Sequence, residues 1–162
     1  MAAQNINEPQ TESGAAHLSL RAISLILVFI GVVVSGYLSY VKLAEKEVIC
    51  RTSGELNCNE VLSSPQAELL GIPIAYLGLA TYLVIGALLL LENRSSFWRE
   101  TGILLLFGLI SFAFLYSVYL VYLQGLVIGA WCQWCLTHEA TMTVLFIVTS
   151  LRLKRALANT PQ

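Results

Sequence analysis

The chain has 162 residues, of which 57% are hydrophobic and 12% are charged, and its mean hydropathy is +0.73. This balance is far from that of a soluble globular domain and indicates an integral membrane protein. With a formal net charge of -1 and no long basic run, the chain gives no reason to expect nucleic acid as a partner.

Four apolar stretches match the roughly 20 residues that a helix needs to cross the hydrocarbon core. They cover about Ala22–Leu43, Ile72–Leu91, Gly102–Leu123 and Leu126–Leu151. The sequence therefore predicts an all-α integral membrane four-helix bundle that accounts for nearly the whole chain. A closed bundle of four spans needs no second copy, so we expect a monomer.

The two ends of the chain are more polar than its middle. Residues 1–18 offer little that could be buried, which predicts a flexible tail. The apolar stretch that follows is too long for the core of a signal peptide and has no obvious cleavage site after it, so we expect a retained helix. The predicted division is a tail over 1–18, a membrane domain over 19–155 and a second tail over 156–162.

Basic residues predict the orientation, because Lys and Arg next to a span resist translocation. Four spans put both termini on one side, and this side carries six basic residues against three on the other. We therefore expect cytosolic termini and an extracytosolic loop between the first two helices. The six are Arg21, Arg94, Arg99, Arg152, Lys154 and Arg155, and the three are Lys42, Lys46 and Arg51.

The longest connection, residues 44–71, holds two of the four cysteines, Cys50 and Cys58. Loops of more than about 15 residues in a compact domain are usually functional or disordered. Residues 59–64 could form a short amphipathic helix stopped by Pro65, so that the loop caps the bundle. On the extracytosolic side disulfides form and persist, so this pair is either redox-active or an inert staple of the loop.

Cys132-Gln133-Trp134-Cys135 lies at a predicted helix beginning. Cysteines three apart on a helix share a face and can close a small disulfide ring, and the positive end of the helix favours the Cys132 thiolate. Beside the loop pair, this motif predicts an electron relay between a soluble protein and an acceptor in the lipid. One alternative is that Cys132 and Cys135 are two small buried hydrophobic residues, and another is a non-enzymatic scaffold with structural disulfides. A third is a zinc site made of all four cysteines. Because only one of the two pairs has metal-ligand spacing, we expect no metal.

Aromatic side chains gather near the same membrane boundary. Trp131 and Trp134 flank the second cysteine motif, and tyrosines lie on the preceding span. These rings either form the belt that anchors helices at the interface or line a flat pocket for a quinone. Phe112, Tyr116 and Tyr119 follow helical spacing and could form one wall of such a pocket.

Glu139 is a carboxyl group well inside a predicted membrane helix, where such groups are costly and usually face the bundle interior. It shares a helix face with Cys132 and Cys135 and lies about one turn deeper than Cys135. We expect it either to relay protons during quinone reduction or to be a neutral packing group bonded to a neighbouring Ser, Thr or Tyr. His138 points about 100° away, which predicts a structural role.

Four features of the chain occur together: Cys50 and Cys58 in the first loop, Val-Leu-Ser-Ser at 61–64, Gly-Ile-Pro at 71–73 and the Cys-x-x-Cys motif that opens the fourth span. In these features, over about residues 22–151, the chain resembles the vitamin K epoxide reductase family in its bacterial form. Many bacterial members are fused to a thioredoxin-like domain. The resemblance therefore implies a separate thioredoxin-like (DsbA-like) partner, or a longer natural chain.

The resemblance implies a role for each cysteine. Cys50 would exchange with the dithiol of the partner, and Cys58 would pass electrons to Cys132. Cys135 would face the quinone. Ser64 is similar to the family's polar loop residue near the quinone site.

The implied enzyme is a membrane thiol:quinone oxidoreductase that re-oxidises its partner and supports disulfide formation, in a bacterial inner membrane. Glu139 stands where the vertebrate enzymes carry a tyrosine, so we favour simple quinone reduction over vitamin K epoxide reduction, the alternative activity. The quinone would be of the ubiquinone, menaquinone or phylloquinone type. Its expected contacts are Ser64, Phe112, Tyr116, Cys135 and Glu139.

Overall fold

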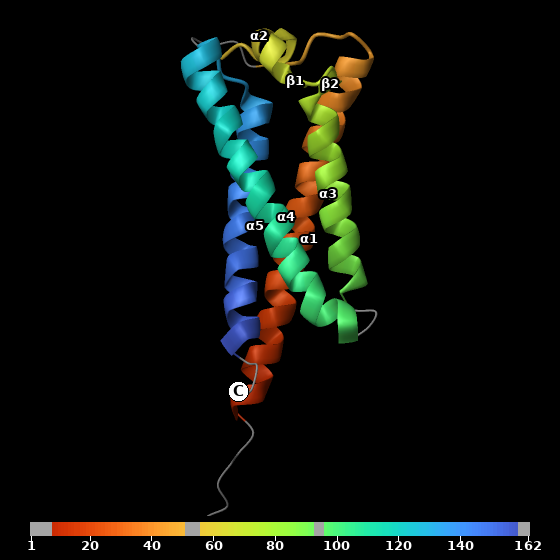
Figure 1. Cartoon of the computed structure of the whole chain (residues 1–162), viewed down its shortest axis with the longest axis vertical. Helices are drawn as coiled ribbons and strands as arrows, with labels where there is room; N and C mark the ends of the chain where they lie inside the picture. The colour runs from red at the N-terminus through yellow and green to blue at the C-terminus, as the bar shows by residue number, and fades with distance from the viewer. Residues whose placement is uncertain (1–7, 51–55, 93–95, 159–162) are drawn as a thin grey trace, which may run out of the picture.

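The structure, a computed structural model, describes residues 8–50, 56–92 and 96–158. Four long helices run side by side, and short elements lie across one end of them, the loop end (Figure 1). Helix α1 begins and helix α5 ends at the opposite end, the terminal end. The elements are α1 (Glu8–Leu43), α2 (Cys58–Ser63), a 3-10 turn (Pro65–Ala67), β1 (Glu68–Leu69), β2 (Ile72–Pro73), α3 (Ile74–Leu91), α4 (Ser96–Tyr122), a π-helical turn (Leu123–Ile128) and α5 (Gln133–Ala158).

The long helices are the membrane spans. By length and composition, Ser19–Leu43, Ile74–Leu91, Thr101–Ile128 and Gln133–Ala158 can each cross a membrane. The predicted all-α four-helix membrane bundle is therefore confirmed. The described residues add one antiparallel ribbon of two-residue strands, β1 and β2, which the sequence did not suggest.

Helix α1 begins earlier than the sequence predicted. Residues 8–18, assigned to a flexible tail over 1–18, form the first turns of α1, whereas 1–7 lie outside the described residues. Pro9 falls in the first turn, where its missing N–H costs no hydrogen bond. Since adding residues to an existing helix needs no new nucleation, the apolar span can extend the helix into its polar flank. Likewise, α5 runs to Ala158 and covers the start of the tail predicted over 156–162.

The break between the last two spans lies later than predicted. The sequence placed it near residue 124, but the third span continues as the π-helical turn to Ile128. Gly129 ends it with a φ of 71°, a left-handed conformation that glycine adopts without a steric penalty. The fourth helix therefore begins at Gln133 instead of Leu126, and Cys132 lies directly before its first residue.

Helix α2 is the short loop helix that the sequence predicted at 59–64. The Asn57 side chain accepts a hydrogen bond from the backbone N–H of Glu60 at 3.3 Å and caps the helix, which ends before Pro65. Lys42, at the end of α1, holds the segment down. Its Nζ donates to the carbonyl of Leu62 at 3.3 Å and lies 3.2 Å from the Glu68 carboxylate.

Helices α1 and α3 pack closely at Gly31. A Cβ at Gly31 would lie 2.3 Å from the ring of Tyr82, which is completely buried, so only glycine fits there. This contact belongs to the apolar core, whose buried members come from all four long helices. They are Val28, Tyr82, Ile85, Leu89, Leu106, Ile110, Met142 and Leu145.

A buried ion pair joins α5 to the end of α3. Arg152 has no exposed surface, and its Nη2 donates to both carboxylate oxygens of Glu92, at 2.8 and 2.6 Å. The sequence counted Arg152 among the cations that flank the spans, but the structure places it inside the bundle. Arg21 adds a hydrogen bond of 2.9 Å from its Nη2 to the Leu89 carbonyl.

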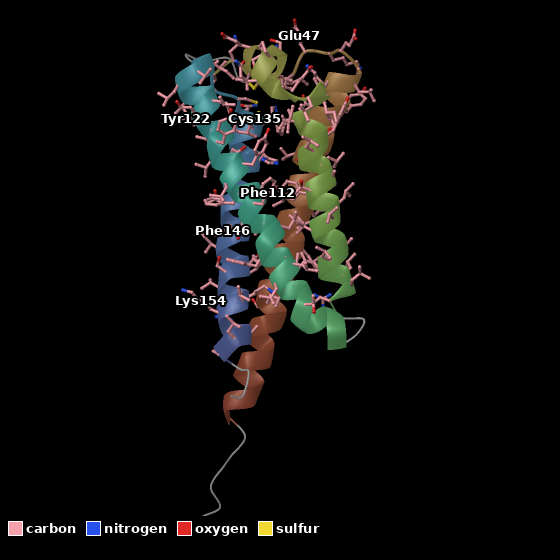
Figure 2. All side chains as sticks on the ribbon, in the orientation of Figure 1. Glu47, Phe112, Tyr122, Cys135, Phe146 and Lys154 are labelled. Atoms are coloured by element: carbon pink, nitrogen blue, oxygen red, sulfur yellow. A yellow bond between two sulfur atoms is a disulfide. The ribbon has the colours of Figure 1, made fainter. Side chains whose placement is uncertain are left out.

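We expect Glu92→Gln to lower the free energy of unfolding by about 3–5 kcal/mol, because it leaves the Arg152 charge buried and uncompensated. Thermal unfolding of the purified protein in detergent measures the loss. Glu47→Gln, at an exposed carboxylate on the loop end (Figure 2), is the matched control and should leave the midpoint unchanged. Equal midpoints for the two variants would contradict a stabilising pair.

Candidate functional site: a thiol cluster above an apolar cavity

The two loop cysteines are joined. Cys50 and Cys58 form a disulfide across a sequence separation of 8, while Cys132 and Cys135 are free thiols. Cys58 has no exposed surface, and Cys50 is half-buried. Of the loop pair, Cys50 is thus the sulfur that a second protein can approach more easily.

Backbone contacts fasten the loop to the segment before α5. The N–H of Asn57 donates to the carbonyl of Trp131 at 3.0 Å, and Leu56 pairs with Trp131 as an isolated parallel bridge. On the other side of the disulfide, the N–H of Val48 donates to the Asn59 side-chain oxygen at 2.8 Å. The residue next to Cys58 and the residue next to Cys132 are therefore held side by side.

A second attachment holds the residue before Cys50. The indole N–H of Trp134, inside the Cys-x-x-Cys motif, donates to the Ile49 carbonyl at 2.9 Å. The Ile49 N–H donates to the Tyr37 hydroxyl at 3.2 Å, and the Tyr37 and Trp134 rings lie 4.8 Å apart. We call Tyr37, Ile49 and Trp134 the Ile49 clamp.

Cys58 and Cys132 are both completely buried and belong to one apolar cluster at the loop end, with Val41, Val48 and Val61. Cys50 and Cys135 pack against the same cluster. The structure thus brings the two predicted cysteine pairs together at one end of the bundle.

Cys132 is held from two directions. Its N–H donates to the side-chain oxygen of Gln124 at 3.2 Å, and its sulfur accepts from the N–H of Cys135 at 3.3 Å. The pKa of Cys132 is lowered, chiefly by the hydrogen bond from the Cys135 thiol, with smaller help from the backbone N–H groups of Cys135 and Trp134; burial opposes the shift. The sequence predicted the direction of this shift but ascribed it to the helix end.

Gln124 is a site residue that the sequence analysis missed. It is 3% exposed and lies in the π-helical turn. A single glutamine at the end of a span is unremarkable in the sequence, and only the turn directs it inward. π-Helical turns are frequent at functional sites, but no residue pattern predicted this one.

Below the thiols lies a cavity of about 550 Å³. Its walls come from the four long helices and from the loop segment, and most of the lining side chains are apolar. Cys135 is the one cysteine of the four on its wall. The five residues expected to contact a quinone, Ser64, Phe112, Tyr116, Cys135 and Glu139, all line this cavity, whereas Tyr119 does not.

One side of the cavity reaches the outer surface of the spans. Val84 on α3 is 50% exposed and Phe112 on α4 is 72% exposed, and both line the cavity. Phe112 lies about midway along the bundle and Cys135 lies nearer the loop end (Figure 2). The cavity therefore opens between α3 and α4 toward the surface that faces the hydrocarbon.

Glu139 is 7% exposed, and its Oε1 lies 3.5 Å from Nδ1 of His138. The Ser, Thr or Tyr partner considered from the sequence is not found: Glu139 Oε2 is buried without a hydrogen-bond partner among the described residues. His138, predicted to be structural, lines the cavity beside Glu139. As for zinc, the described residues contain no group of three or more His, Cys, Asp or Glu placed to hold a metal ion.

A family model, that of the vitamin K epoxide reductase family, matches residues 22–150. The chain belongs to the vitamin K epoxide reductase family. The match includes both cysteine pairs and most of each of the four spans, so the resemblance seen in the motifs is confirmed. Membership makes the chain a membrane oxidoreductase of the quinone-linked, thiol-dependent kind.

We expect Cys132 to react with a small thiol reagent at lower pH than an ordinary cysteine, because a lowered pKa keeps the thiolate present to lower pH. In Cys135→Ala the donated hydrogen bond is lost, so the midpoint of the pH–rate curve should rise. Mass spectrometry of protein with the Cys50–Cys58 disulfide intact measures the rate. An unchanged midpoint would mean that Cys135 does not stabilise the thiolate.

Proposed function

We propose that the protein re-oxidises a thioredoxin-like partner and passes the electrons through Cys50 and Cys58, then Cys132 and Cys135, to a quinone. One observation carries the proposal. Cys58 and Cys132 share a buried cluster, while Cys135 alone of the four cysteines lines an apolar cavity. The four sulfurs thus give an order of transfer that begins at Cys50, on the loop surface, and ends at Cys135, on the wall of the cavity.

The exchange steps use the accessibility of each sulfur. A thiolate of the partner attacks Cys50, the more exposed sulfur, and the bond to Cys58 breaks. Cys58 then attacks the Cys132 sulfur of a Cys132–Cys135 disulfide, which releases Cys135 as a thiolate at the cavity wall. The second thiolate of the partner then attacks the partner sulfur that is bonded to Cys50, which releases the oxidised partner and the Cys50 thiolate. Cys50 attacks the Cys58 sulfur, so the loop disulfide forms again and Cys132 is released; the two protons given up by the partner's dithiol leave Cys132 and Cys135 as thiols.

The combination of a Cys50–Cys58 disulfide with free Cys132 and Cys135 corresponds to the stage after this transfer. Formation of the Cys132–Cys135 disulfide then yields two electrons, and the two thiols yield two protons. A bound quinone supplies an acceptor for both. The residues fit such a group, since the cavity is apolar, opens to the hydrocarbon and has a thiol on its wall.

The orientation belongs to the same proposal. The loop end would face the extracytosolic side, in a bacterial inner membrane, and the terminal end would face the cytosol. The membrane domain over 19–155 would work as a monomer with a separate DsbA-like protein. Disulfide-permissive conditions on that side are what the thiol chemistry needs.

Purified protein mixed with a reduced thioredoxin-like protein should bleach added ubiquinone or menaquinone, and Cys135→Ala should abolish turnover. Thr137→Ala is the control, since Thr137 is exposed on α5 and does not line the cavity. A variant with Cys50→Ser and Cys135→Ser, treated with oxidised glutathione as the oxidant, should accumulate a Cys58–Cys132 disulfide. Wild-type protein that leaves the quinone unreduced would support a scaffold instead.

We expect Val84→Trp, which narrows the side opening, to raise KM several-fold for a quinone with a long isoprenoid tail and to change KM little for its tail-less ring. Steady-state absorbance with both acceptors makes the comparison. Leu83→Trp is the matched control, because Leu83 is equally lipid-facing at 55% exposure and lies outside the cavity lining. Equal effects on both acceptors would argue against entry from the bilayer.

A further inference from the structure

His138 and Glu139 form a pair beside Cys135 that the thiol relay does not use. On a helix, residues three and four positions after a given residue both neighbour it, so both side chains lie next to Cys135. His138 Nδ1 faces Glu139 Oε1 at 3.5 Å. Both residues line the cavity together with Cys135.

The imidazole is held in one orientation. The Tyr82 ring packs against it edge-on, with centroids 5.3 Å apart and an interplanar angle of 82°. The Tyr82 hydroxyl also donates to the His138 carbonyl at 3.5 Å. With Nδ1 turned toward Glu139, the other nitrogen, Nε2, is turned toward α3.

Gly78 makes the room for this nitrogen. A Cβ at Gly78 would lie 3.2 Å from His138 Nε2 and 3.5 Å from Ser35 Oγ, and all three residues line the cavity. The two polar atoms therefore face one small region at the cavity wall. A larger residue than glycine on α3 would fill it.

Two buried polar atoms at this wall have no hydrogen-bond partner among the described residues: Ser35 Oγ and Glu139 Oε2. An unsatisfied buried polar group costs about 1–3 kcal/mol, and such groups in a native protein call for an explanation. Atoms of this kind beside an imidazole nitrogen, in an otherwise apolar cavity, are suited to a ligand with its own polar oxygen. A quinone carbonyl is such a group.

We propose that His138 donates a hydrogen bond and then a proton to the quinone oxygen, and that Glu139 holds the imidazole and returns the proton to it. The inference rests on the proposed quinone reduction. The S–H bond of Cys135 breaks and its proton goes to the Glu139 carboxylate, then to Nδ1 of His138, while Nε2–H gives its proton to the oxygen. One O–H bond forms for this S–H bond lost, and the electron pair passes to the quinone as the Cys132–Cys135 disulfide forms. The proton of the Cys132 thiol goes to the second quinone oxygen, so two S–H bonds become two O–H bonds.

His138→Ala should lower kcat for quinone reduction by about 10²-fold, the low end for a general acid. Added imidazole should restore part of the rate. The Cys58–Cys132 disulfide, formed with oxidised glutathione as the oxidant in place of quinone in the Cys50→Ser, Cys135→Ser background, should form as before. This last readout separates the proposal from thiol exchange itself.

Binding gives a readout without turnover. In a Cys135→Ala background, quenching of tryptophan fluorescence by added quinone should show affinity about 2- to 10-fold weaker once His138 is removed, which corresponds to one hydrogen bond. Gly78→Ala, which keeps His138 but crowds Nε2, should weaken binding in the same direction. Gly36→Ala is its control, because a Cβ there meets nothing within 4 Å.

Unchanged kcat and affinity in His138→Ala would overturn the proposal, as would a loss of rate that imidazole does not restore. Loss of the Cys58–Cys132 disulfide in the same variant would also overturn it, since the substitution would then act through the thiols. Absence of quinone reduction in the wild type would be a failure of the proposed function instead. Should His138→Ala fail to fold, the Gly78→Ala and Gly36→Ala pair decides by binding alone.

Discussion

The hydrocarbon core offers no hydrogen-bonding partner, so each polar group in the spans must find one inside the protein. Most hydroxyl groups solve this locally: Thr81 and Ser111, for example, donate to the carbonyls four residues earlier, at 2.8 and 2.6 Å. Arg152 Nη2 and the Glu92 carboxylate solve it across helices, whereas Nε and Nη1 of Arg152 have no partner among the described residues. Ser35 Oγ and Glu139 Oε2 at the cavity wall are among the buried atoms without a partner in the described residues, and under the proposal above they would face the polar oxygen of the quinone.

The loop end has to satisfy two opposite requirements. Thiol exchange needs Cys58 beside Cys132, and both are buried in one cluster; it also needs the loop to move when the partner binds. The Ile49 clamp and the Asn57–Trp131 contact hold the loop through single neutral hydrogen bonds, each with a net contribution of about 0.5–1.5 kcal/mol. Contacts of this strength position the sulfurs and can still be broken during a reaction cycle.

Helix α5 connects the two halves of the proposed chemistry. Cys132 lies directly before its first residue, its first turn carries Cys135 and the Trp134 side of the clamp, and the next turn carries His138 and Glu139. Under the proposal, electrons reach the quinone from the loop cysteines through Cys132 and Cys135. The proton of Cys135 reaches the same quinone through Glu139 and His138. The side opening between α3 and α4 suits an acceptor that arrives through the bilayer.

The sequence alone determined the four spans, the capping loop helix, both cysteine pairs and the family, because membrane length, local capping and motif spacing are properties of short segments. It did not determine the π-helical turn that directs Gln124 to Cys132, the start of α5 at Gln133, or the inward place of Arg152. Nor did the sequence place His138 at the cavity: its angle from Glu139 follows from the helix, but the glycine on α3 that makes room for it lies 60 residues earlier. Contacts between helices decide such positions, and no local pattern encodes which side chain of a neighbouring helix will be small.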